Sequence, residues 1–231
     1  MNNYTVKYTI MRLFSNGCSF LTERPKNGVH TFVSKILSEK YDLPLSNIAM
    51  GGRGNDRINF STKLWIEKNR HTKYFAVIGW SSSLRNDYIS NDAHKIDYKD
   101  NFFSWRSYDL TKLPVKFLRK IKNIDIEKTS AIRWLTHVLD LQCFFKYKNI
   151  PYVMYNALPP FNNFNNDEYN LLFNKIDRTR FFKIETSQLE YIIKNNYIVS
   201  ADDPHPSTEG HILWTEQLKD FIDANDLRTI R

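Results

Sequence analysis

Short apolar runs alternate with amphipathic stretches along the chain. Continuous apolar runs of about four to eight residues are typical of strands buried on both faces, and apolar residues three or four positions apart are typical of helices. The runs predict strands at residues 8–14, 47–50, 74–79, 151–156 and 197–200. The spaced pattern predicts helices at residues 29–39, 56–68, 129–148, 168–176 and 187–194, and a last helix that begins at Ser207. Because strands and helices alternate, we expect a parallel sheet with helices on both faces.

The segment of residues 80–128 interrupts this alternation. Its periodicity is weak, and it is rich in Tyr, Phe, Trp, Asp and Asn. We predict a long excursion with short helices inside a single domain of residues 1–231, and such excursions often form lids or binding regions. Its aromatic residues either pack the excursion onto the core or form a stacking platform for a sugar or another planar ligand. Phe102, Phe103, Trp105 and Tyr108 are the residues concerned.

Polar or Gly-rich motifs follow the predicted strands. They read SNGCSF, GGRGN, GWSSS, ALPPFNN and ADDPHP. Five of the seven glycines, at positions 17, 51, 52, 54 and 79, lie in the first three of these loops. Glycine is needed where the backbone turns tightly or approaches a ligand closely, and ligands of parallel sheets bind beyond the carboxyl ends of the strands. The clustering therefore predicts one site at that edge of the sheet.

Composition is typical of a folded protein. The chain has 231 residues, of which 42% are hydrophobic and 15% aromatic, and this excludes a disordered class. No apolar run approaches the roughly 20 residues that cross a bilayer, and the N-terminal residues lack the features of a secretion signal. We therefore expect a cytoplasmic protein with no membrane partner. Two cysteines, Cys18 and Cys143, are too few for a disulfide framework, so we expect reduced thiols.

The chain carries a formal net charge of +8, from 33 basic and 25 acidic residues. An excess of this kind can attract nucleic acid or another polyanion. The lysines are, however, spread along the predicted helix surfaces, as on an ordinary solvated face, so we expect no nucleic-acid partner. The densest basic cluster is KFLRKIK at residues 116–122.

Ser19 and His205 form a candidate nucleophile and base. A serine hydroxyl is a poor nucleophile unless a base removes its proton, and that base needs an orienting partner. Asp202 lies three residues before His205, a spacing that lets its carboxylate fold back onto the imidazole, and Asp203 is the alternative partner. Cys18 is the alternative nucleophile, because thiolates are intrinsically reactive. Without a catalytic role, Ser19 would cap the following helix and His205 would be a structural loop residue.

These residues resemble the sequence blocks of the SGNH (GDSL-type) hydrolases. Gly17, Cys18 and Ser19 resemble the Gly-Asp-Ser turn of that family, with Cys in place of Asp. Residues 47–52 resemble its Asn- and Gly-containing second block, and Asp202 to His205 resembles its Asp-x-x-His block. The resemblance implies a three-layer α/β/α sandwich with a parallel, flavodoxin-like sheet. It also implies Ser19 as nucleophile, His205 as base, Asp202 as its partner, and the N–H groups of Ser19 and Gly52 as oxyanion donors.

The third block departs from the family pattern. The family has Gly-x-Asn-Asp there, and the Asn side chain donates to the oxyanion, whereas this chain has Gly79-Trp80-Ser81-Ser82. Ser81 thus stands in the place of the Asn. A serine hydroxyl can also donate a hydrogen bond, so we expect Ser81 in the oxyanion hole, with Arg85 or Asn86 as alternatives.

Four further residues are candidate substrate contacts, namely Trp80, Arg53, Asn55 and Arg85. Arg53 is expected to be exposed in the GGRGN loop, where it could contact an anionic substrate. That loop lacks the Lys-Ser/Thr pair of a phosphate-binding P-loop. The histidines at positions 71 and 94 show no paired metal-ligand spacing, so we expect neither a metal nor a cofactor.

The resemblance implies a serine hydrolase that cleaves a carboxylic ester, as an esterase or O-deacetylase. Its substrate would be a small-molecule or glycan ester. Two alternatives stay open. The same triad could transfer the acyl group to an acceptor hydroxyl, or the scaffold could serve binding or structure without catalysis.

Overall fold

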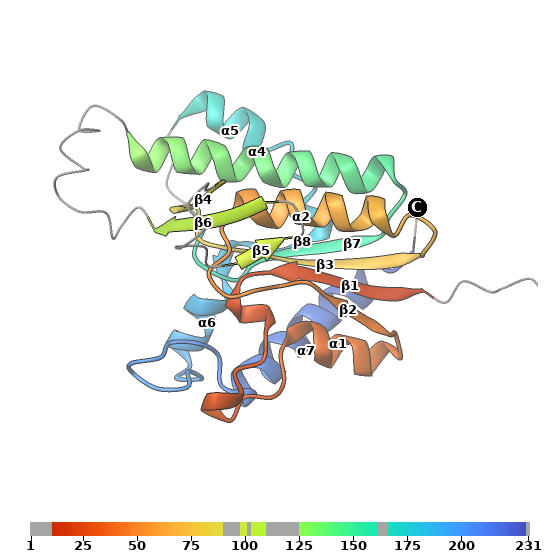
Figure 1. The fold of residues 1–231 in the computed structure, drawn as a ribbon, viewed down its shortest axis with the longest axis vertical. Helices are drawn as coiled ribbons and strands as arrows, with labels where there is room; N and C mark the ends of the chain where they lie inside the picture. Colours follow the sequence, from red (N-terminus) through yellow and green to blue (C-terminus); the bar gives the residue numbers. More distant parts are fainter. Residues whose placement is uncertain (1–10, 90–97, 101–102, 110–124, 161–165, 230–231) are drawn as a thin grey trace, which may run out of the picture.

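A five-stranded parallel sheet forms the centre of the molecule (Figure 1). The computed structural model describes residues 11–89, 98–100, 103–109, 125–160 and 166–229. The strands are β1 (Arg12–Gly17), β2 (Leu45–Asn47), β3 (Tyr74–Trp80), β7 (Tyr152–Asn156) and β8 (Phe181–Ser187). They lie in the order β2-β1-β3-β7-β8, and every neighbouring pair is parallel. This is a doubly wound order, in which the chain changes direction between β1 and β3.

Helices cover both faces of this sheet (Figure 1). On one face lie α1 (Val33–Tyr41), α6 (Gln188–Lys194) and α7 (Thr208–Ala224), and on the other lie α2 (Asn55–Lys68), α4 (Ile126–Tyr147) and α5 (Asp167–Phe173). All seven residues of β3 are buried, and alternate side chains enter opposite layers. Ala76 and Ile78 join the core under α2 and α4, whereas Phe75 and Val77 join the core under α1 and α7. The predicted three-layer α/β/α fold is confirmed.

The fifth strand differs from the sequence prediction. Residues 197–200 were predicted as a strand, but they contribute only an isolated bridge between Ile198 and Pro206. The fifth strand is β8, whose burial alternates irregularly and whose Lys183 has a positive φ of 45°. An edge strand of this kind lacks the continuous apolar run by which buried strands are recognised. The Ile198–Pro206 bridge instead closes the loop that carries His205.

The first two strands are also shifted from their predicted positions. β1 begins at Arg12 rather than at residue 8, although residues 8–10 lie outside the described part of the chain. β2 ends at Asn47, and the chain continues alongside β1 through hydrogen bonds from the backbone N–H groups of Ile48 and Met50. These groups donate to the carbonyls of Ser15 and Gly17 at 2.9 and 3.2 Å. The GGRGN loop is thereby held beside the carboxyl end of β1.

The excursion contains a second, antiparallel sheet rather than short helices in its described part. Its strands are β4 (Arg85–Ile89), β5 (Tyr98–Asp100) and β6 (Phe103–Asp109), in the order β4-β6-β5. The Trp105 ring is buried and lies 5.7 Å from the Phe60 ring of α2, so this aromatic residue packs the excursion onto the body of the molecule. The side chains of Phe102 and Phe103, His94 and the basic cluster at residues 116–122 lie outside what is described. Within the described residues, no helix is long and apolar enough to pass through a bilayer.

Candidate active site

Two facing glycines shape the turn that carries Ser19. β1 ends at Gly17, which is in register with Gly79 of β3, and Ser19 begins the short 3-10 helix η1 (Ser19–Leu21). A Cβ on Gly17 would lie 2.7 Å from the Gly79 carbonyl oxygen and 2.7 Å from Leu21 Cδ1. A Cβ on Gly79 would lie 2.4 Å from the same Leu21 atom. The bare backbone at both positions therefore lets the fully buried Leu21 pack over the strand ends, and this fixes the turn at Ser19.

Ser19 and His205 meet across the fold. The distance from Ser19 Oγ to His205 Nε2 is 2.8 Å, although 186 residues separate them in sequence. His205 Nδ1 lies 2.5 Å from Asp203 Oδ1. A carboxylate can only accept a hydrogen bond, so Nδ1 carries the imidazole proton and Nε2 is free to accept from the Ser19 hydroxyl. The three side chains thus form a continuous Ser–His–Asp relay of hydrogen bonds.

The partner of His205 is Asp203 and not Asp202, which the sequence spacing favoured. Asp203 and His205 each precede a proline, and residues before proline favour extended backbone. Side chains two positions apart in extended backbone point to the same side, which brings the Asp203 carboxylate to the imidazole. Asp202 is exposed. The prediction of Asp202 assumed a helix-like turn, and the two prolines exclude it.

Two residues that the sequence did not indicate hold Asp203 in place. Arg24 donates to Asp203 Oδ2 at 2.6 Å, and the Asn27 amide donates to the same oxygen. Both come from the RPKNG turn around the 3-10 helix η2 (Pro25–Asn27), where Gly28 adopts a φ of 71°. Pro and Gly there predict a turn. Nothing in the local sequence shows that this turn faces a loop about 180 residues away.

Electrostatics favour the protonation states that a nucleophile–base pair requires. Burial lowers the pKa of His205 below its ordinary value of 6.5, and the hydrogen bond to Asp203 opposes that shift. The Phe20 ring, 5.1 Å from the imidazole, contributes to this burial. Partial burial of Asp203 raises its pKa, but the hydrogen bonds from His205 and Arg24 outweigh it and lower the pKa below 3.8. At neutral pH, His205 is therefore neutral and able to accept a proton, and Asp203 is ionised.

Cys18 is in an environment that disfavours a nucleophilic role. Its side chain is completely buried within the apolar cluster under α1 and α7. Burial raises the pKa of the thiol above 9.0, so the reactive thiolate is scarce at neutral pH. Ser19, by contrast, is partly exposed and hydrogen-bonded to His205. The geometry favours Ser19 over its neighbour.

Besides Ser19, the two other predicted oxyanion residues differ in accessibility. Gly52 is exposed in the turn beside the end of β1 and has a φ of 79°. Ser81 is 1% exposed, and its N–H donates to Asn55 Oδ1 at 2.9 Å. The Ser81 hydroxyl accepts from Arg85 Nη1 at 3.3 Å. The Ser81 backbone N–H is thus already used, and the Ser81 side chain also hydrogen-bonds to Cys18, which opposes the rise in the pKa of the thiol.

The four candidate substrate contacts occupy different places. Trp80 is fully buried in the core under α2 and α4. Arg53 is 2% exposed, so the expectation of an exposed side chain is wrong; its guanidinium donates to Asn16 Oδ1 and Ser61 Oγ at 3.0 Å each. Asn55 is also buried, and its amide group holds the backbone of Ser81. Arg85 is the one of the four that is partly exposed.

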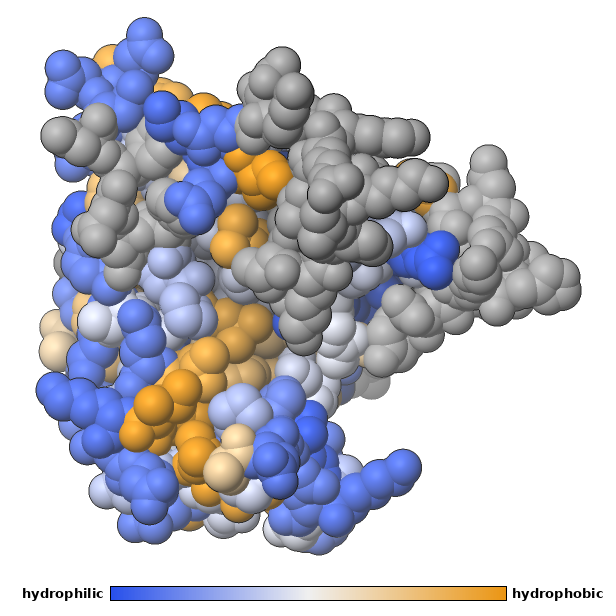
Figure 2. All heavy atoms as spheres, turned by 90° about the vertical axis from the view of Figure 1, so that its left-hand side faces the viewer, coloured by the Kyte–Doolittle hydropathy of each residue, from blue (hydrophilic) through white to orange (hydrophobic). Residues whose placement is uncertain are grey.

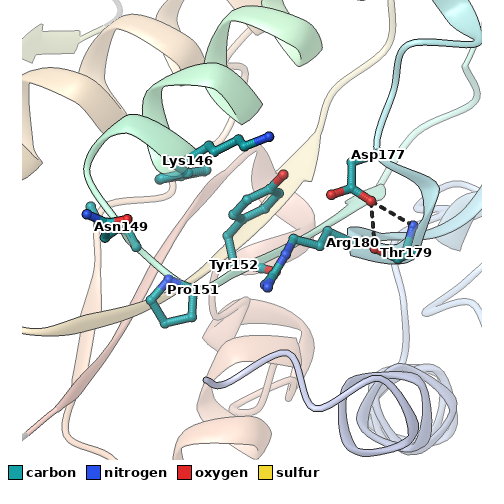
Figure 3. Close-up of a pocket in the computed structure, with 9 residues that line it drawn as sticks. Lys146, Asn149, Pro151, Tyr152, Asp177, Thr179 and Arg180 are labelled. Carbon is teal, nitrogen blue, oxygen red and sulfur yellow. Dashed lines mark hydrogen bonds between the residues drawn. The ribbon is translucent and has the colours of Figure 1, made fainter. Parts of the chain in front are cut away.

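The face that presents the carboxyl ends of the parallel strands is shown in Figure 2. Hydrophobic side chains gather there in a band with hydrophilic side chains on both sides. A separate pocket of about 300 Å³ lies around Tyr152, at the opposite end of the strands (Figure 3). Lys146, Asp177 and Arg180 line that pocket, and none of the candidate catalytic residues does. Among the described residues, no group of three or more His, Cys, Asp or Glu side chains is placed to hold a metal ion.

Comparisons with known proteins give similarity at the level of solved structures. No family model matches the sequence, and no curated protein matches it. The psychrotrophic esterase EstA from Pseudoalteromonas sp. is 15% identical, with 92% of this chain and 97% of that chain covered and a TM-score of 0.48. A catalytic mutant of Axe2, an acetylxylan esterase from Geobacillus stearothermophilus, is 11% identical, with 91% and 93% covered and a TM-score of 0.48.

A third similar structure is a protein described as lipolytic and of the G-D-S-L family, from Desulfitobacterium hafniense DCB-2. It is 11% identical, with 91% of this chain and 98% of that chain covered and a TM-score of 0.41. The solved structures that are similar to this chain thus include esterases and a G-D-S-L protein. The sequence blocks of this chain resemble those of the SGNH (GDSL-type) hydrolases, and its strand order is that of a flavodoxin-like, doubly wound sheet.

Proposed function

We propose that this chain is a serine hydrolase that cleaves a carboxylic ester of a small molecule or a glycan. The observation that carries the proposal is the relay from Ser19 Oγ through His205 to Asp203, with distances of 2.8 and 2.5 Å. An ordinary buried histidine needs a partner for each ring nitrogen, but it does not need a partly exposed serine on one side and a carboxylate held by Arg24 on the other. This arrangement instead matches the needs of nucleophilic catalysis.

The reaction would proceed in two halves. Ser19 Oγ attacks the carbonyl carbon of the ester while His205 Nε2 takes the hydroxyl proton, and Asp203 stabilises the resulting imidazolium. Collapse of the tetrahedral intermediate breaks the bond to the alcohol oxygen, which receives the proton from His205. A water molecule then attacks the acyl-serine, again with His205 as base, and collapse releases the carboxylic acid and restores Ser19.

During both attacks, negative charge develops on the carbonyl oxygen, and hydrogen-bond donors are needed to stabilise it. The proposal assigns this role to the N–H groups of Ser19 and Gly52, with the Ser81 hydroxyl as a third donor. Gly52 is exposed in the loop that the Met50 N–H joins to the Gly17 carbonyl, two residues before Ser19, and this supports the assignment. Losing one such donor typically costs about 10²–10³ in kcat, so a weak third donor would lower the rate without abolishing it.

The test is hydrolysis of p-nitrophenyl esters with short and long acyl chains. We expect turnover by the unmodified protein and a loss of roughly 10⁴-fold or more in the Ser19→Ala variant, because the nucleophile is removed. Cys18→Ala serves as the matched control, since it alters the neighbouring side chain and leaves the relay intact. Circular dichroism checks that both variants are folded. The proposal fails if the unmodified protein shows no turnover with any chain length, or if Ser19→Ala stays active.

A further inference from the structure

We propose that Arg85 binds an anionic group of the substrate, so that the preferred ester carries a carboxylate or phosphate close to the bond that is cleaved. This inference rests on the proposed function, because it assigns a substrate class to the same site. It is carried by the position of the Arg85 guanidinium, by its lack of a counter-ion among the described residues and by the charges around the Ser19–His205 pair.

The Arg85 guanidinium lies at the candidate active site. Arg85 is the first residue of β4, and its Nη1 donates to Ser81 Oγ at 3.3 Å at the carboxyl end of β3. Burial is the main cause that lowers the pKa of His205, and the positive charge of Arg85 lowers it further. Arg85 likewise opposes the rise in the pKa of Cys18 that burial causes. Ser81 lies two residues after Gly79, which is in register with Gly17, so the guanidinium lies beside the turn that carries Cys18 and Ser19.

Arg85 has no anionic partner among the described residues. A guanidinium has five N–H donors, and the hydrogen bond to Ser81 uses one of them. Other arginines of this chain are paired, such as Arg24 with Asp203 at 2.6 Å and Arg133 with Asp56 at 2.7 Å. The unused donors of Arg85 are not sealed in the interior, because none of its nitrogens is both buried and without a hydrogen bond. They are thus available to a ligand.

Among the described charged groups near Ser19, one positive charge, that of Arg85, has no negative partner. Asp203 is ionised and its charge is matched by Arg24, so the charge of Arg85 remains. A partly desolvated cation without a counter-ion is unfavourable, and an incoming anion relieves that cost. Carboxylates and phosphates match the fork of a guanidinium with two parallel hydrogen bonds. The net charge of +8 over the whole chain would also attract anionic substrates to the protein.

Two matched pairs of esters test the substrate class. On the acyl side, mono-p-nitrophenyl glutarate is compared with p-nitrophenyl pentanoate, and on the alcohol side, p-acetoxybenzoate is compared with its methyl ester. We expect the unmodified protein to prefer the anionic member of at least one pair in kcat/KM. The Arg85→Gln variant should lose about 10- to 100-fold of that preference, mainly through a higher KM. Arg85→Lys should restore part of it, because it keeps the charge without the fork.

Arg178→Gln is the matched control. It removes the same charge from an exposed arginine directly before β8, at the amino ends of the strands and away from Ser19. The substitution should leave the preference for anionic esters unchanged. If Arg85→Gln lowers kcat/KM equally for neutral and anionic esters, the guanidinium serves the oxyanion or the fold and the inference is overturned. Equal rates of the unmodified protein on both members of both pairs would overturn it as well.

A binding measurement separates this inference from the proposed function. Benzoate should raise the melting temperature of the unmodified protein, and neutral benzamide should not. The Arg85→Gln variant should lose the response to benzoate. A protein that binds benzoate through Arg85 but hydrolyses none of the four esters would contradict the proposed function alone. A protein that hydrolyses neutral esters but shows no effect of Arg85→Gln on benzoate binding would contradict the inference alone.

Discussion

At the scale of single residues, Ser19 and His205 could be predicted from the sequence, but their environment could not. Ser19 follows the end of β1, and the loop before α7 brings His205 to the same end of the sheet, with Ser19 Oγ 2.8 Å from His205 Nε2. Which carboxylate orients the imidazole depends on backbone conformation, and the two prolines around His205 select Asp203. The burial of Arg53 could not be predicted either, because it depends on hydrogen bonds to Asn16 and Ser61, which only the folded structure brings to its side chain.

The assignment of Asp203 predicts unequal effects of two neighbouring substitutions. Asp203→Asn should lower kcat/KM on a neutral ester by about 10³–10⁴-fold, because the amide no longer fixes the correct tautomer of His205. Asp202→Asn removes the same charge from an exposed position and should change kcat/KM by less than about twofold. Steady-state kinetics with equal amounts of folded protein provide the measurement. A larger loss from Asp202→Asn would show that the loop rearranges and that Asp202 is the partner.

At the scale of elements, fully buried strands were predictable and partly exposed strands were not. The prediction found β3 and β7 because every residue of each is buried, which gives a continuous apolar run. It missed β8, in which exposed Lys183, Glu185 and Thr186 interrupt the buried positions. It also predicted short helices in the excursion, where β4 and β6 pair as antiparallel strands. Both strands contact α2, through Asp87 and Trp105, and the local sequence does not reveal this neighbour.

Asp87 connects the excursion to the start of α2 and provides a test at this scale. Its buried carboxylate accepts hydrogen bonds from the backbone N–H groups of Gly54 and Arg57 at 2.8 and 3.2 Å, and also from the Ser107 hydroxyl. Asp87→Ala should lower the free energy of unfolding by about 1–3 kcal/mol, because buried donors lose their acceptor. Urea unfolding measures this difference.

The conservative variant Asp87→Asn keeps an oxygen acceptor and should therefore cost less stability than Asp87→Ala. If Asp87→Ala were as stable as the unmodified protein, the hydrogen bonds from Gly54 and Arg57 to the Asp87 carboxylate would not hold β4 against α2. Because β4 begins at Arg85, loss of this attachment should also weaken any selectivity that depends on the Arg85 guanidinium.

At the scale of the whole molecule, the alternation of strands and helices was enough to predict the layers. The order β2-β1-β3-β7-β8 then places the loops after β1 and β3 side by side at the point where the chain changes direction. The Ser19 turn and the Ser81 loop occupy that point, and the loop before α7 brings His205 to it. The net charge of the whole molecule does not by itself indicate a partner; it favours an anionic substrate only together with Arg85, which has no counter-ion among the described residues.

The central claim is that the fold activates the Ser19 hydroxyl as a nucleophile. The most direct measurement is mass-spectrometric mapping of the residue that a fluorophosphonate probe modifies. We predict a single adduct on Ser19, much slower labelling of His205→Ala and none of Ser19→Ala. An adduct on Cys18 or elsewhere, or no adduct on the folded protein, would contradict the claim.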